Sequence, residues 1–287
     1  MYDFFDFLKT SSESLKYSSF ESEILYTGRD ISGAYPDDLH KKNEEKLISH
    51  FKKNPERFKK YNWVDDDGNL IYPKYKTNKF GYRTQIEYED GISIALGCSY
   101  TFGLGVHEEQ TWPYLLSKEL NKPIINLGIC GGSLDSSYRV LKSYLEEYKP
   151  DCVFISIPSA LRFSLMYRRD SSKIGTLLIL PNHTHSTPGN EGGMIKDYVD
   201  KLYEGIYGID ENMYLNFNKN LDAIRYLCSS NNIKLVELLC PAMYNQNNIL
   251  EKNNITYDYN ISFDDIHLGP EINEVTTSEF LKLYNID

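Results

Sequence analysis

The strongest constraint on the fold is an alternation, from residue 91 onward, between short apolar runs and segments with helical periodicity. The apolar runs predict strands over 92–97, 123–128, 151–158 and 234–240, and the segments between and after them predict helices over 111–121, 133–148, 213–232 and 276–285. Parallel strands need crossover connections, and helices are the usual crossovers. The sequence therefore predicts an α/β fold with a parallel central sheet.

The first 90 residues have a different character. Lys, Asp, Tyr and Asn dominate, and the charged stretch HKKNEEKLISHFKKNPERFKKY (40–61) has helical character without a wide apolar face. We interpret 1–90 as an N-terminal extension that packs on a core domain spanning 91–287, and we expect it to end in a strand and turn at YKTNKFGYRT (75–84). Within the core domain, 162–212 is interpreted as an irregular insertion, and long insertions of this kind are usually functional.

Charge and composition exclude several classes of partner. The chain has 41 acidic and 31 basic residues and a net charge of -10, which argues against binding to nucleic acid. No apolar run approaches the roughly 20 residues of a membrane span, and the N-terminus lacks a signal-peptide pattern, so we expect a soluble, by default cytoplasmic, protein. The five cysteines are scattered without CxxC spacing, which predicts free thiols. Nothing in the sequence indicates the oligomeric state.

Ser99 directly follows the first predicted strand, in the glycine-rich stretch IALGCSYTFGLG (94–105). Ligands of α/β sheets bind beyond the carboxyl ends of the strands. Ser99 is therefore either a turn residue or a nucleophile. A nucleophilic serine needs a base within hydrogen-bond reach and a group that orients the base.

Among the histidines, His267 in SFDDIHLGPE is the best candidate for that base. Asp264 precedes it by three positions, so one short segment could supply both imidazole and carboxylate; equally, this segment could be an Asp-rich turn that caps the next helix. His183 and His185 have the spacing of a metal pair, but no Cys or carboxylate cluster lies nearby in the sequence, which favours a solvated loop. The remaining histidines are His40, His50 and His107.

Three short motifs resemble, in order and spacing, the sequence blocks of the SGNH (GDSL-type) serine hydrolases. They are GCSYTFG (97–103), NLGICGGS (126–133) and DDIHLGP (264–270). The resemblance covers 91–287 and implies a flavodoxin-like α/β/α sandwich. It also implies hydrolysis of esters, thioesters or acetyl groups through an acyl-enzyme, without a metal or an organic cofactor.

By this resemblance, Ser99 is the nucleophile, His267 the general base and Asp264 the acid of the catalytic triad. The backbone N–H groups of Ser99 and Gly131 would form the oxyanion hole. The third family block, G-x-N-D, is replaced by ISIPSALRF (155–163), so the asparagine donor is absent. Ser159 is nearest to its position, and Arg162 could substitute for it electrostatically, although both could equally be ordinary loop residues.

Two further segments bear on the site. Cys98 stands where the family has Asp; its side chain should point away from the direction of the Ser99 side chain, which disfavours it as a rival nucleophile. TNKFGYRT (77–84) resembles a segment that precedes the serine block in some bacterial and viral members, and we expect an edge strand there.

The hypothesis that follows is a serine esterase acting on short acyl esters of a small molecule or glycan. The abundance of Tyr, Asn, Arg and His in 162–212 suits a carrier with hydroxyl groups. Two alternatives remain open: acyl transfer to a sugar hydroxyl by the same residues, or a glycan-binding or structural module that has lost turnover.

Overall fold

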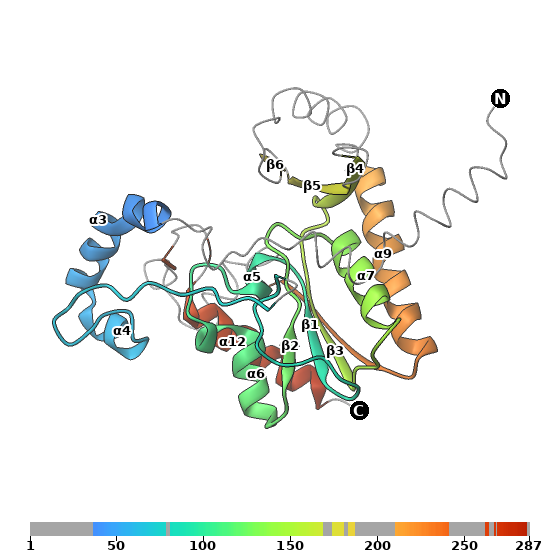
Figure 1. Cartoon of the computed structure of the whole chain (residues 1–287), viewed down its shortest axis with the longest axis horizontal. Helices are drawn as coiled ribbons and strands as arrows, with labels where there is room; N and C mark the ends of the chain where they lie inside the picture. The colour runs from blue at the N-terminus through green and yellow to red at the C-terminus, as the bar shows by residue number, and fades with distance from the viewer. Residues whose placement is uncertain are drawn as a thin grey trace.

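A parallel four-stranded sheet forms the centre of the chain (Figure 1). Its strands are β1 (Ser93–Leu96), β2 (Ile124–Asn126), β3 (Cys152–Ile157) and β7 (Lys234–Leu239), in the spatial order β2-β1-β3-β7. The computed structural model describes residues 37–78, 81–168, 174–180, 183–186, 210–240, 262–263, 267 and 269–285. All four strands fall where the sequence predicts them, and every pairing in the sheet is parallel.

Helices cover both faces of this sheet, which confirms the predicted α/β sandwich (Figure 1). On one face lie α6 (Trp112–Leu120) and α12 (Pro270–Tyr284), and on the other lie α7 (Leu134–Tyr144) and α9 (Asp210–Ser230). Helix α12 begins at Pro270 and not at the expected residue 276, because proline is well suited to the first helical turn, where its missing N–H breaks no bond.

The alternation of side chains along each strand divides the core into two parts. In β1, Ile94 and Leu96 pack in the cluster that α7 and α9 cover, whereas Ala95 packs with Trp112 of α6 and Phe280 of α12. Successive strand residues point to opposite faces, so a strand covered on both faces must be apolar throughout. This requirement explains the nearly continuous apolar runs of β1 and β3, whereas β7, at the end of the strand order, carries Lys234 and Glu237.

Part of the region interpreted as an irregular insertion, 162–212, is regular structure. Strands β4 (Phe163–Arg168), β5 (Ile174–Leu180) and β6 (His183–Ser186) form an antiparallel sheet in the order β4-β5-β6. The HTH segment is therefore a strand and not a loop. Antiparallel strands can be joined by short connections. The polar residues of these connections interrupt the apolar pattern of the three strands, so the sequence pattern did not reveal the sheet. Residues 169–173, 181–182 and 187–209 lie outside the described part of the chain.

The N-terminal extension is helical where the charge pattern predicts it. Helix α3 (Asp37–Lys53) is followed by α4 (Pro55–Lys60), and the Asn54 side chain between them accepts a hydrogen bond from the Arg57 N–H. Asn is a favoured N-cap, and Pro55 occupies the first turn of α4. Residues 1–36 lie outside the described part, and the division of the chain at residue 90 stays a prediction.

Of the strand and turn expected within 75–84, the residues described there form the turn and no strand. The N–H groups of Gly81 and Tyr82 bond to the main chain and side chain of Asn78. The short helical segments α5 (Ser99–Phe102) and η2 (Glu108–Gln110) complete the described elements.

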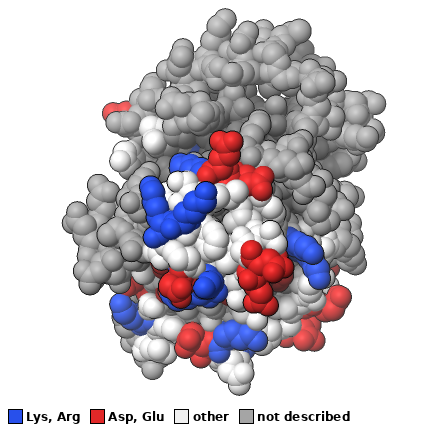
Figure 2. All heavy atoms as spheres, turned by 90° about the vertical axis from the view of Figure 1, so that its left-hand side faces the viewer, with Lys and Arg blue, Asp and Glu red and all other residues white. Residues whose placement is uncertain are grey.

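No helix within the described ranges is long and apolar enough to cross a membrane. On the face shown in Figure 2, basic and acidic side chains are interspersed.

Two glycines with nearly the same backbone conformation allow a test of how tightly the Ser99 region is packed. Gly103 has φ +81°, and a Cβ there would lie 2.1 Å from Thr111 Cγ2; Gly91 has φ +82° and nothing within 4 Å of such a Cβ. Both Gly→Ala variants incur the left-handed strain of about 1–2 kcal/mol. We expect crowding to lower the free energy of unfolding of Gly103→Ala by a further 1–3 kcal/mol, on the order of the usual cost of overpacking. Urea unfolding of both variants measures the difference, and equal losses would contradict the packing.

Candidate active site

Ser99 lies at the carboxyl end of β1, as the first residue of α5. In the strand order β2-β1-β3-β7, β1 has neighbours on both sides that follow it in the chain, so its end is a topological switch point where ligands bind. Gly97 makes the turn possible: its φ is +148°, and a Cβ there would lie 2.2 Å from Thr101 Oγ1. The turn places Ser99 at the carboxyl end of β1, where 4 % of the surface of this residue is exposed.

His267 reaches this serine from the other end of the chain. Its Nε2 atom lies 2.7 Å from Ser99 Oγ, across 168 positions of sequence. The Tyr100 ring packs on the imidazole in an edge-type arrangement, with the ring centroids 4.9 Å apart and the ring planes at 61°. A neutral imidazole with an unprotonated Nε2 can accept the serine proton at this distance. Asp264, the expected orienting acid, lies outside the described residues.

The loop after β2, which contains Gly131, lies against the Ser99 turn. The N–H of Ile129 donates to the carbonyl of Gly97 at 3.0 Å, and a Cβ on Gly132 would lie 3.2 Å from that same oxygen. Gly131 is half-buried and has φ +76°, a conformation that favours glycine. The two loops that would supply backbone oxyanion donors are therefore neighbours.

Ser159 follows β3 in a short turn. Its Oγ accepts the N–H of Leu161 at 3.2 Å, and its carbonyl accepts the N–H of Arg162 at 3.1 Å. In Arg162 itself, the buried Nη1 atom has no hydrogen-bond partner in the described part of the chain. Such a donor retains capacity for a further acceptor.

Cys98 is fully buried beside the candidate nucleophile. A hydrogen bond with Cys240 and the positive charge of Arg162 lower the pKa of the Cys98 thiol to about 6, although burial alone would raise it. Ser99 is itself buried, with 4 % of its surface exposed, and the observation that favours it over Cys98 as the candidate nucleophile is the 2.7 Å contact of its Oγ with His267 Nε2.

The glycine-rich loop after Ser99 is held by Arg83, from the GYR segment whose role the sequence left open. Arg83 is 1 % exposed, and its guanidinium donates to the carbonyls of Gly103 and Phe102, and to that of Val106 at 2.9 Å. The guanidinium carbon of Arg83 lies 4.7 Å from the centre of the Tyr75 ring. Burial lowers the pKa of Arg83. A buried guanidinium thus fixes three carbonyls of the loop that begins at α5.

The described residues contain no group of three or more His, Cys, Asp or Glu that could hold a metal ion.

Searches of family models and of curated proteins found no match to this chain. Solved structures do match, among them a lipolytic protein of the G-D-S-L family from Veillonella parvula, with 13% identity, a TM-score of 0.34 and coverage of 68% of this chain and 98% of that one. A putative G-D-S-L lipolytic protein from Desulfitobacterium hafniense shares 15% identity with a TM-score of 0.31, covering 67% of this chain and 98% of that one. An acetyl xylan esterase has 18% identity and a TM-score of 0.31, covering 67% and 98%. These similarities are low, so the function is inferred from the residues of the site.

Proposed function

We propose that the protein is a serine esterase in which Ser99 is the nucleophile and His267 the general base. The observation that carries the proposal is the 2.7 Å contact between His267 Nε2 and Ser99 Oγ. Its position at the switch point of the sheet adds to this support. A serine hydroxyl becomes an effective nucleophile only when such a base accepts its proton.

The chemistry runs in two halves. His267 Nε2 takes the proton of Ser99 as Oγ attacks the ester carbonyl, and the imidazolium then gives that proton to the departing alcohol oxygen. The resulting acyl-serine is attacked by water, which loses a proton to His267 in turn, and collapse of this second intermediate releases the acid and restores Ser99. In this proposal Asp264 orients the imidazole and stabilises its charged form.

The negative charge on the carbonyl oxygen needs donors that are fixed before the reaction begins. We assign this role to the N–H groups of Ser99 and Gly131, supported by the contact between their loops at Gly97. Ser159 takes the place of the missing asparagine as a third donor, and the Arg162 charge assists it. The substrate class we propose is a short acyl ester on a glycan or another carrier with hydroxyl groups, which suits the Tyr, Asn, Arg and His content of 162–212.

The nucleophile can be tested with a fluorophosphonate probe and with p-nitrophenyl acetate, butyrate and octanoate. We expect labelling of the wild type at Ser99, none in Ser99→Ala, and faster turnover of the acetate than of the octanoate. His267→Ala should lower kcat/KM by about 10⁴-fold or more, because the hydroxyl loses its base.

Two outcomes would redirect this assignment. Labelling that persists in Ser99→Ala would exclude Ser99 as the nucleophile. A folded wild type that neither labels nor hydrolyses any of the three esters would favour the binding-module alternative, which the absent asparagine motivates. Added sugar acceptors separate hydrolysis from acyl transfer through the product formed.

The third oxyanion donor is tested by Ser159→Ala. We expect kcat for p-nitrophenyl acetate to fall on the order of 10²-fold with KM little changed, because the lost interaction exists mainly in the transition state. Ser230→Ala, at an exposed serine on α9, is the matched control. Wild-type kcat in Ser159→Ala together with a large loss in Arg162→Gln would transfer the role to Arg162.

A further inference from the structure

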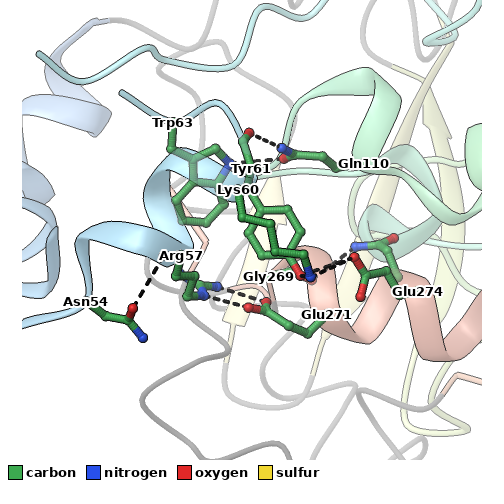
Figure 3. A network of polar contacts seen from close by, with 10 residues as sticks. Asn54, Arg57, Lys60, Tyr61, Trp63, Gln110, Gly269, Glu271 and Glu274 are labelled. Atoms are coloured by element: carbon green, nitrogen blue, oxygen red, sulfur yellow. Dashed lines mark hydrogen bonds and ion pairs between the residues drawn. The ribbon is translucent and has the colours of Figure 1, made fainter. Parts of the chain in front are cut away.

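The N-terminal extension touches both flanks of the segment that carries His267. Its contacts come from α4 and the residues just after it, and Figure 3 shows Arg57, Lys60 and Tyr61 directed at the first turns of α12. These residues lie more than two hundred positions from their partners, since Arg57 and Glu271 are 214 apart.

The flank after His267 is held by an ion pair with two hydrogen bonds. Arg57 Nε lies 2.5 Å from Glu271 Oε1, and Arg57 Nη2 lies 2.9 Å from Oε2. The two side chains are 6 % and 14 % exposed. Paired, nearly parallel bonds of this kind fix orientation as well as distance. Glu271 belongs to the first turn of α12, so the bond fixes the start of the helix that follows the histidine.

The flank before His267 is held by aromatic packing. Phe263 is fully buried, and its ring centroid lies 4.6 Å from that of Trp63. Its N–H donates to the carbonyl of Gly105 at 2.8 Å, which ties this flank to the loop that follows Ser99. The Trp63 indole donates to Gln110 Oε1 at 3.0 Å, which fixes the plane of the ring.

A single contact joins these two anchors into one unit. The Arg57 guanidinium carbon lies 4.8 Å from the centre of the Trp63 ring, a cation–π arrangement. One side of this pair contacts Glu271 and the other contacts Phe263, with His267 between them in the chain.

We propose that Arg57 and Trp63 are positioning residues that hold His267 at hydrogen-bond distance from Ser99. The proposal rests on Ser99 and His267 being the reacting pair. A displacement of about 1 Å in a reacting group can cost on the order of 10²-fold in rate, so fixing both flanks has a direct effect on turnover. The extension is then a part of the active-site support and more than a cover for the core domain.

The test compares Arg57→Met with a matched control, Lys60→Met. Lys60 forms an ion pair with Glu274 of the same helix at 3.5 Å, but its side chain is 61 % exposed and that of Glu274 is 47 % exposed. Exposed pairs contribute little. We expect Arg57→Met to lower kcat for p-nitrophenyl acetate by about 10- to 100-fold with KM little changed, Lys60→Met to keep wild-type kcat, and Arg57→Lys to recover part of the loss.

A second measurement does not depend on activity. Hydrogen exchange at the Phe263 amide, which bonds to Gly105, should be faster in Arg57→Met and in Trp63→Leu than in the wild type and Lys60→Met. Because exchange at this amide does not depend on turnover, it reports on the flank of His267 even in a variant that is folded but poorly active.

The outcomes separate this proposal from the proposed function. A wild type that neither labels with fluorophosphonate nor turns over esters defeats the assignment of the reacting pair, whatever Arg57→Met does. A wild type that labels and turns over, with Arg57→Met equal to it in kcat and in Phe263 exchange, overturns only the positioning role.

Discussion

The contact between Ser99 Oγ and His267 Nε2 depends on bringing two segments that are 168 positions apart together at the carboxyl end of β1. Ser99 is placed by the turn after β1, which is crowded enough that a side chain at Gly97 would meet Thr101 and the carbonyl of Ser156. His267 is placed from outside the sheet, by the segment that enters α12. The geometry of the Ser99–His267 contact is therefore set by how rigidly two separate segments are held.

Each segment has its own support, and both supports involve residues before position 91. Arg83 binds the carbonyls of the loop that follows Ser99, and the hydroxyl oxygen of Tyr75 accepts the N–H of Gly105 in the same loop at 2.9 Å. Arg57 and Trp63 contact the flanks of the histidine. Burying a guanidinium is costly unless its donors are satisfied. Carbonyls supply acceptors to the terminal nitrogens of Arg83, whose Nε has no hydrogen-bond partner among the described residues, and a carboxylate accepts both bonds from Arg57.

The parts of the fold that sequence predicts well are those with local signals. Strands β1 and β3 are largely apolar because both of their faces are covered, and α6, α7 and α9 show helical periodicity. The sheet β4-β5-β6 was missed because its strands lie among polar residues, and the start of α12 was placed too late because Gly269 and Pro270 look like a loop.

At the site, the sequence alone named Ser99 and His267 as candidates, from the motif resemblance and from the small number of histidines, and the structure brings their side chains to 2.7 Å. It could not identify Arg57 or Trp63, because a contact between residues 214 positions apart leaves no periodic or local pattern in the chain. Arg83 was visible within a motif, but its role needed the three-dimensional arrangement of the carbonyls around it. The role of Asp264 as the orienting acid stays a prediction, because this residue lies outside the described part of the chain.

The most direct measurement of the central claim is the rate of fluorophosphonate labelling of Ser99 in wild type and in His267→Ala. The imidazole accepts the serine proton as Oγ attacks, so the variant should label at least about 10²-fold more slowly than the wild type. A variant that labels as fast as the wild type would contradict the claim that His267 activates Ser99.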